Sequence, residues 1–160
     1  MRIFKIIDDH LKLHKLGMDQ ELQKNLGPEW KVEYYHAQRR GAIKRVYPTE
    51  DDKDFFDFGP EDEVFVFWNY FWGNDYKDRV FQDKVKERVL ELIKQGFRIK
   101  MEIYTSYGDY CESERELKEY REYFGENIVV DRVPHIMHHE SMIPAWAESE
   151  ARIINSFYAS

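Results

Sequence analysis

The chain lacks the features that mark several large classes of protein. It has a single cysteine, Cys111, among 160 residues, which excludes an intrachain disulfide. No stretch approaches the roughly 18 apolar residues of a membrane-spanning helix, and the first residues lack the apolar core of a signal peptide. These absences predict a cytoplasmic protein with no membrane-embedded part.

An excess of positive charge is also missing. The 24 lysines and arginines are outnumbered by 31 aspartates and glutamates, which gives a net charge of −7. The one basic cluster, Arg39-Arg40 followed by Lys44-Arg45, fits a solvated turn, so we expect no nucleic-acid partner. An acidic balance of this kind favours a partner that is a protein, a metal ion or a small molecule.

Familiar catalytic motifs and signs of several domains are absent too. The sequence contains no glycine-rich dinucleotide loop, no P-loop, and no GxSxG, HExxH or CxxC motif. It shows no repeat, low-complexity tract or linker, and its length suits one domain covering residues 1–160. With 42% hydrophobic residues, such a chain can bury a core without a disulfide or a metal.

The stretch from Val64 to Tyr107 organises the expected fold. Residues 64–68 form an unbroken apolar run, typical of a buried strand, and residues 98–104 form a second strand. Between them, apolar residues at helical spacing predict a helix that ends near Gly96. They are Phe81, Val85, Val89 and Leu92. A strand, a helix and a second strand connected in this way predict a parallel pair.

The flanking segments extend this alternation. We expect a strand at 2–7, one helix over 11–26, an edge strand with one wet face at 30–35, a helix at 113–124, a strand at 128–130 and a last helix from Pro144. Within 37–63, residues 42–47 suit a short strand or a helical turn. The acidic stretch 48–60 suits a loop that packs its phenylalanines on the core, with an exposed aromatic loop as the alternative. The pattern predicts a single-domain α/β protein with an open, mostly parallel sheet of about five strands and helices on both faces.

In such sheets, ligands bind beyond the carboxyl ends of the strands, where the strand order reverses. That rule selects the loops at 8–10, 69–75, 105–109 and 131–139. Two of them carry a recognisable pattern. Residues 2–10, Arg-Ile-Phe-Lys-Ile-Ile-Asp-Asp-His, are a strand followed by an acidic pair, and residues 100–106 are a strand that ends in Thr105-Ser106. Together with residues 63–68, they resemble the receiver domain of response regulators.

The resemblance implies a receiver or flavodoxin-like fold with a pocket at Asp8, Asp9, Asn69, Thr105 and Arg132. In that family an acidic pair holds Mg²⁺, and an aspartate at the end of the third strand accepts a phosphoryl group. Here Trp68-Asn69 stands at that strand end, and an amide cannot act as the carboxylate nucleophile. Arg132 stands where the family has a lysine. The resemblance therefore implies a pseudo-receiver that works without aspartyl phosphorylation.

Aromatic side chains crowd the end of the same strand. Trp68, Tyr70, Phe71 and Trp72 are more than one strand end buries on one side, so we expect some of them on the surface. Aromatic residues are enriched at the anchors of protein interfaces. This loop therefore predicts a non-enzymatic adaptor, regulator or inhibitor that binds a protein partner or a second copy of itself.

An alternative follows from a cluster of possible metal ligands. His135, His138 and His139 lie close together in sequence, and their loop is expected on the same side of the sheet as Asp8 and Asp9. Imidazoles and carboxylates of this kind bind Mg²⁺, Mn²⁺ or Zn²⁺. The alternative function is a metal-dependent hydrolase, although a polar helix start would also account for the histidines.

Overall fold

The computed structural model describes residues 1–8, 11–37, 43–69, 76–104, 118, 121–131 and 140–158. Within these ranges the chain forms a six-stranded sheet in the order β3-β2-β1-β4-β5-β6. The strands are β1 Arg2–Asp8, β2 Trp30–Ala37, β3 Ile43–Tyr47, β4 Glu63–Asn69, β5 Arg98–Tyr104 and β6 Ile128–Asp131. All neighbouring pairs are parallel except β2–β3, which is antiparallel. The expected mostly parallel α/β sheet is thus confirmed, with one strand more than predicted.

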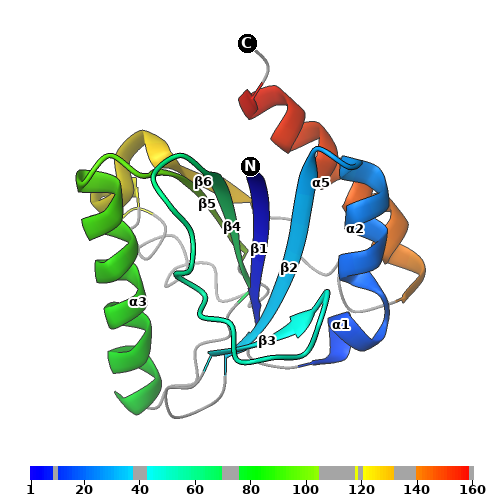
Figure 1. Ribbon diagram of the computed structural model, residues 1–160, viewed down its shortest axis with the longest axis horizontal. Helices are drawn as coiled ribbons and strands as arrows, with labels where there is room; N and C mark the ends of the chain where they lie inside the picture. Colours follow the sequence, from blue (N-terminus) through cyan, green and yellow to red (C-terminus); the bar gives the residue numbers. More distant parts are fainter. Residues whose placement is uncertain are drawn as a thin grey trace.

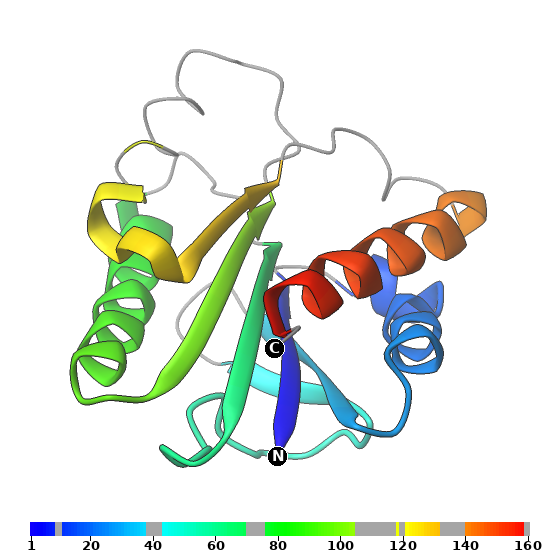
Figure 2. The same cartoon turned by 90° about the horizontal axis from the view of Figure 1, so that it is seen from above.

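Helices cover both faces of the sheet, as Figures 1 and 2 show. They are α1 Lys12–Lys15, α2 Met18–Leu26, α3 Tyr76–Lys94 and α5 Ile143–Tyr158. Helices α1, α2 and α5 pack on one face, which we call the α5 face, and α3 packs on the other, the α3 face. Residues 121–124 are helical as well and place Phe124 in the core of the α3 face.

Strand alternation divides the core between these faces. Phe4 and Ile6 of β1 point to the α5 face, whereas Ile7 points to the α3 face. The predicted α3 positions Val85 and Val89 are buried on the α3 face. A positive φ of 94° at Gly96 follows the end of α3, as expected for a helix C-terminus.

The predicted helix over 11–26 is two helices. The backbone at Gly17 has φ 86° and ψ 19°, a left-handed conformation that ends α1 and directly precedes α2. Because the chain turns there, the side chains of His14 and Asp19, five residues apart, meet across the break. An uninterrupted helix brings together residues three or four apart, not five.

The prediction of a wet face on β2 is wrong. On the side expected to be wet, Glu33 and Tyr35 have no exposed surface, and Lys31 keeps 40% of its side chain exposed. β3 occupies the edge beside β2, and the segment 48–62, which we call the strap, lies on the α3 face. Phe55 of the strap is 1% exposed and packs edge-on against Tyr35. The strap therefore packs its phenylalanine on the core, as the first interpretation of this loop predicted.

The last helix follows the prediction. Pro144 stands in its first turn, and Trp146 and Ile154 are buried on the α5 face. Phe157, near the end of the helix, is 37% exposed, and its ring centroid lies 6.2 Å from that of Phe65 on the α5 face.

Candidate functional site

The strand order reverses between β1 and β4. From β1 the chain first adds β2 on one side, and it later returns to place β4 on the other. In the strand register, the last residue of β1, Asp8, is paired with Asn69 on β4 and with His36 on β2. The edge at which ligands bind in sheets of this type thus carries an acid flanked by an amide and a histidine.

Asp8 lies inside the fold at this edge. Its side chain has no exposed surface, and its Oδ2 accepts a hydrogen bond from the hydroxyl of Tyr34. Tyr34, also fully buried, belongs to the core of the α5 face. A buried carboxylate needs such a donor because its desolvation is costly. Asp8 is therefore anchored to the sheet through β2.

A second polar pair lies beside this one. The ring of His14 on α1 has its centroid 5.4 Å from that of Tyr34 and 6.5 Å from that of Tyr47. His14 Nδ1 lies 2.5 Å from Oδ2 of Asp19 on α2. Asp19 is fully buried, but 26% of the His14 side chain is exposed. At the break between α1 and α2, a partly exposed imidazole thus contacts a fully buried carboxylate.

Burial dominates the electrostatics of Asp19. Loss of solvation raises the pKa of its carboxyl above the usual value, and the hydrogen bond and charge of His14 oppose that shift. The backbone N–H of Gln20 donates to Asp19 Oδ1 at 2.8 Å. Burial and the charge of Asp19 together raise the pKa of Tyr47.

The α3 face holds a different charged group, the ionic network under the strap. Glu33 lies 3.1 Å from Lys5 Nζ, 2.8 Å from Arg45 and 3.2 Å from Lys53. Arg45 in turn pairs with Asp51 of the strap. Burial by itself raises the pKa of Glu33, but these cations outweigh it and hold the pKa below the usual value.

Lys5 is enclosed at the centre of this network. Its Nζ donates to the carbonyl oxygen of Phe55 at 2.7 Å and lies 4.9 to 5.3 Å from the ring centroids of Tyr35, Phe58 and Phe55. Burial lowers the pKa of Lys5, and the charge of Glu33 counteracts this only in part. Neither Lys5 nor Glu33 has exposed surface, whereas Lys53 and Asp51 at the margin of the network are partly exposed, so its centre ties the strap to the sheet.

Several predicted site residues fall outside the described part of the chain. Asp9, Thr105 and Arg132 of the receiver-like pocket lie outside the described residues, as do the histidines His135, His138 and His139. The backbone of Asn69 is described, and its register beside Asp8 brings together two of the predicted pocket positions. Within the ranges that the structure describes, no group of three histidine, cysteine or acidic side chains could hold a metal ion.

The prediction of an exposed aromatic strand end needs a correction at its first residue. The side chain of Trp68 is 2% exposed and belongs to the core of the α3 face, so it is not available to a partner. Alternation along the strand turns it to that side, as it does Val64 and Val66. Tyr70, Phe71 and Trp72 are not among the described residues, and their proposed contact with a partner stays a prediction.

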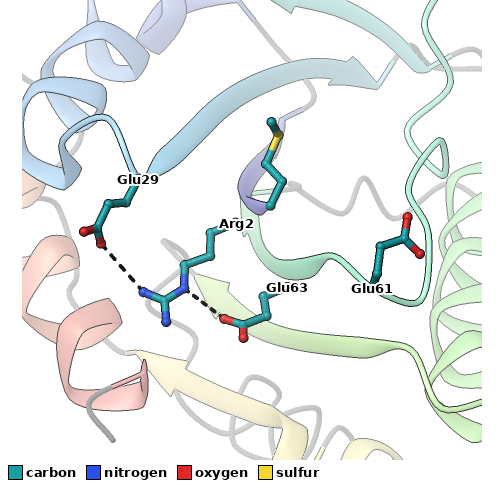
Figure 3. A pocket seen from close by; sticks show the side chains of 5 residues that line it. Arg2, Glu29, Glu61 and Glu63 are labelled. Atoms are coloured by element: carbon teal, nitrogen blue, oxygen red, sulfur yellow. Dashed lines mark hydrogen bonds and ion pairs between the residues drawn. The ribbon is translucent and has the colours of Figure 1, made fainter.

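A hollow of about 530 Å³ lies at the opposite, amino edge of the sheet. Figure 3 shows Arg2 held between Glu29, at 3.9 Å, and Glu63, at 3.0 Å, with Glu61 farther along its wall. The Arg2 guanidinium also lies over the rings of Trp30 and Tyr158. Because Arg2 is already paired, the hollow presents exposed acids but no distinctive chemistry.

Comparisons of the chain with models of known protein families, with curated proteins and with solved structures found no match. None of the described helices is long and apolar enough to cross a membrane. The site must therefore be interpreted from its own geometry.

Sequence reasoning missed His14, Asp19 and Tyr34. Gly17, a poor helix former, is the signal that could have revealed the pair, because a break there brings residues 14 and 19 together. The Tyr34–Asp8 hydrogen bond spans 26 positions in the sequence and left no local signal.

Proposed function

We propose that this chain is a receiver-like protein-binding module that acts without aspartyl phosphorylation. The observation that carries the proposal is the register of β1 and β4, which sets Asp8 directly beside Asn69 at the edge where the strand order reverses. In a receiver, the neighbour of the acidic pair is the aspartate that accepts the phosphoryl group. Here it is an amide, which has neither the charge nor the nucleophilicity for that step.

The order of the parallel strands supports the receiver or flavodoxin-like part of the proposal. Without the antiparallel edge strand β3, the strands follow the order β2-β1-β4-β5-β6. Counted along the chain, this is the order 2-1-3-4-5 of flavodoxin-like sheets. The strap and β3 then take the place that a helix occupies in the connection from the second to the third parallel strand of that fold.

The binding part rests on the residues that follow β4. Tyr70, Phe71 and Trp72 come directly after Asn69 in the sequence, next to the reversal of strand order. Aromatic residues at such a position suit the anchor of a protein interface. The partner is another protein or a second copy of the chain, and a cytoplasmic location stays part of the proposal.

Phosphorylation gives the first test. Incubation with acetyl phosphate and Mg²⁺ should leave the intact mass unchanged, because Asn69 cannot form an acyl phosphate. A stable gain of one phosphoryl group on any aspartate would refute the proposal.

The variant Asn69→Asp gives the matched test. If Asn69 faces the acidic pair, the added carboxylate should raise the affinity for Mg²⁺, measured by calorimetric titration. Unchanged affinity would mean that position 69 does not face the pair and that the resemblance to receivers is coincidental.

Self-association is tested by light scattering after size exclusion. If the partner is a second copy, the wild type should be dimeric or larger and Trp72→Ala should shift it toward monomer. A monomeric wild type would eliminate self-association and leave a different protein as the partner.

The alternative function, a metal-dependent hydrolase, is tested with untagged protein. The absence of bound metal, together with no thermal shift on addition of Mg²⁺, Mn²⁺ or Zn²⁺, would count against it.

A further inference from the structure

Among the polar groups of the described residues, the His14–Asp19 pair joins a fully buried acid to a partly exposed imidazole. Lys5 and Glu33 are enclosed and committed to each other, and Arg2 is held by glutamates. In the His14–Asp19 pair, the acid has no exposed surface while a quarter of the histidine side chain reaches solvent. Burial of a carboxylate costs free energy, and here the buried carboxylate contacts a partly exposed histidine ring.

The contacts of Asp19 define which ring nitrogen of His14 is already paired. Oδ1 accepts the backbone N–H of Gln20, and Oδ2 lies against His14 Nδ1. A carboxylate that accepts on both oxygens holds the proton on Nδ1, which leaves the lone pair on Nε2. Within the part of the chain that the structure describes, Nε2 has no hydrogen-bond partner.

The ring is also held in orientation. Tyr34 and Tyr47 pack against it, and Tyr34 is itself fixed by its hydrogen bond to Asp8. A side chain locked by packing and by a supporting hydrogen bond has the preorganisation that a reactive group requires.

We propose that His14 is the nucleophile of an acyl-transfer site for small neutral esters. Nε2 attacks the carbonyl carbon, an N–C bond forms, the C–O bond to the leaving group breaks, and that group departs with the bonding electrons. Water then attacks the acyl-imidazole, which releases the carboxylic acid and restores the imidazole. Asp19 is a positioning residue whose charge stabilises the imidazolium that develops during the attack.

Charge selects the class of substrate. The carboxylate of Asp19 lies against the ring and the chain carries a net charge of −7, so a neutral ester suits this site better than an anionic phosphoryl donor. The activity goes beyond the proposed binding role, and its tests depend neither on Asn69 nor on a protein partner.

Hydrolysis of p-nitrophenyl acetate, followed by absorbance, provides the first test. His14→Gln should lower the enzyme-dependent rate by about 100-fold, the usual size of such contributions. Lys15→Gln, on the exposed neighbouring residue of α1, is the matched control and should retain the wild-type rate. Equal rates in the wild type and His14→Gln would overturn the proposal.

The role of Asp19 is tested by Asp19→Asn, with circular dichroism to confirm folding. We expect kcat to fall by about tenfold or more with little change in KM, and the pH profile to change shape. An unchanged kcat in the folded variant would refute the positioning role.

A measurement on the wild type avoids any doubt about folding. Diethyl pyrocarbonate should modify His14 first among the six histidines, as read by peptide mass mapping over time. Modification of His14 after the others would show that Nε2 is not an open nucleophile and would also overturn the proposal.

Discussion

Each face of the sheet buries an acidic side chain, but the groups that surround the two acids differ. On the α3 face, Glu33 has several cations around it, and their charge keeps its pKa low in spite of burial. On the α5 face, Asp19 has a histidine and backbone N–H donors but no full cation beside it, and burial raises its pKa. A carboxylate enclosed by cations connects the segments that carry those cations. A carboxylate that contacts a single partly exposed ring is suited to orienting that ring.

The largest expected effect on stability comes from replacing the acidic residue of the ionic network under the strap. Glu33→Gln leaves the cations Lys5, Arg45 and Lys53 around a neutral amide. We expect it to lower the free energy of unfolding by about 3–5 kcal/mol, because unpaired buried charge is costly. Urea unfolding monitored by tryptophan fluorescence measures the loss. A loss below about 1 kcal/mol would show that the network does not fasten the strap.

Removing the central cation should cost less. In Lys5→Met, Glu33 keeps Arg45 and Lys53, and the apolar side chain enters the ring cage of Phe55 and Phe58. Burial already lowers the pKa of Lys5, which indicates that its charge is poorly solvated there. We expect a loss of about 1–2 kcal/mol in the same assay. A loss equal to that of Glu33→Gln would mean that the two charges act as one inseparable pair.

The break between α1 and α2 can be tested next. Gly17 has φ 86°, and a Cβ there meets nothing within 4 Å, so Gly17→Ala adds backbone strain without a steric clash. We expect a loss of about 1 kcal/mol of stability, measured by thermal unfolding. Gly125→Ala, at φ 61° with equally open surroundings, is the matched control for strain. Gly17→Ala alone should also slow the modification of His14 by diethyl pyrocarbonate, and equal slowing in both variants would contradict the role of the break.

These differences show what could be predicted from the sequence. The β4–α3–β5 unit was predicted because its signals are local: an apolar run, helical spacing and Gly96 at the helix end. The burial of Glu33 was missed because Lys5 and Arg45, which compensate its charge, lie 28 and 12 positions away and carry no pattern of their own. Asp8 was found through the resemblance to receiver domains. The contact between His14 and Asp19 depends on the helix break at Gly17, and helix propensity indicates only that a glycine weakens a helix there.

The last prediction concerns pH and separates the two acids by sign. The pKa of Glu33 is lowered in the fold from 4.5, so its contribution is complete above that pH and is lost as the pH falls through the folded value. The pKa of Asp19 is raised from 3.8, so its contribution is complete below pH 3.8 and is lost as the pH rises through the folded value.

The difference in unfolding free energy between the wild type and Glu33→Gln should therefore grow as the pH rises from the acid end. The difference between the wild type and Asp19→Asn should shrink over the corresponding range. Urea unfolding of the three proteins at a series of pH values from strongly acidic to neutral measures both trends. If the two differences changed in the same direction with pH, the proposed contrast between Glu33 and Asp19 would be wrong. The His14–Asp19 pair would then be a second structural ion pair.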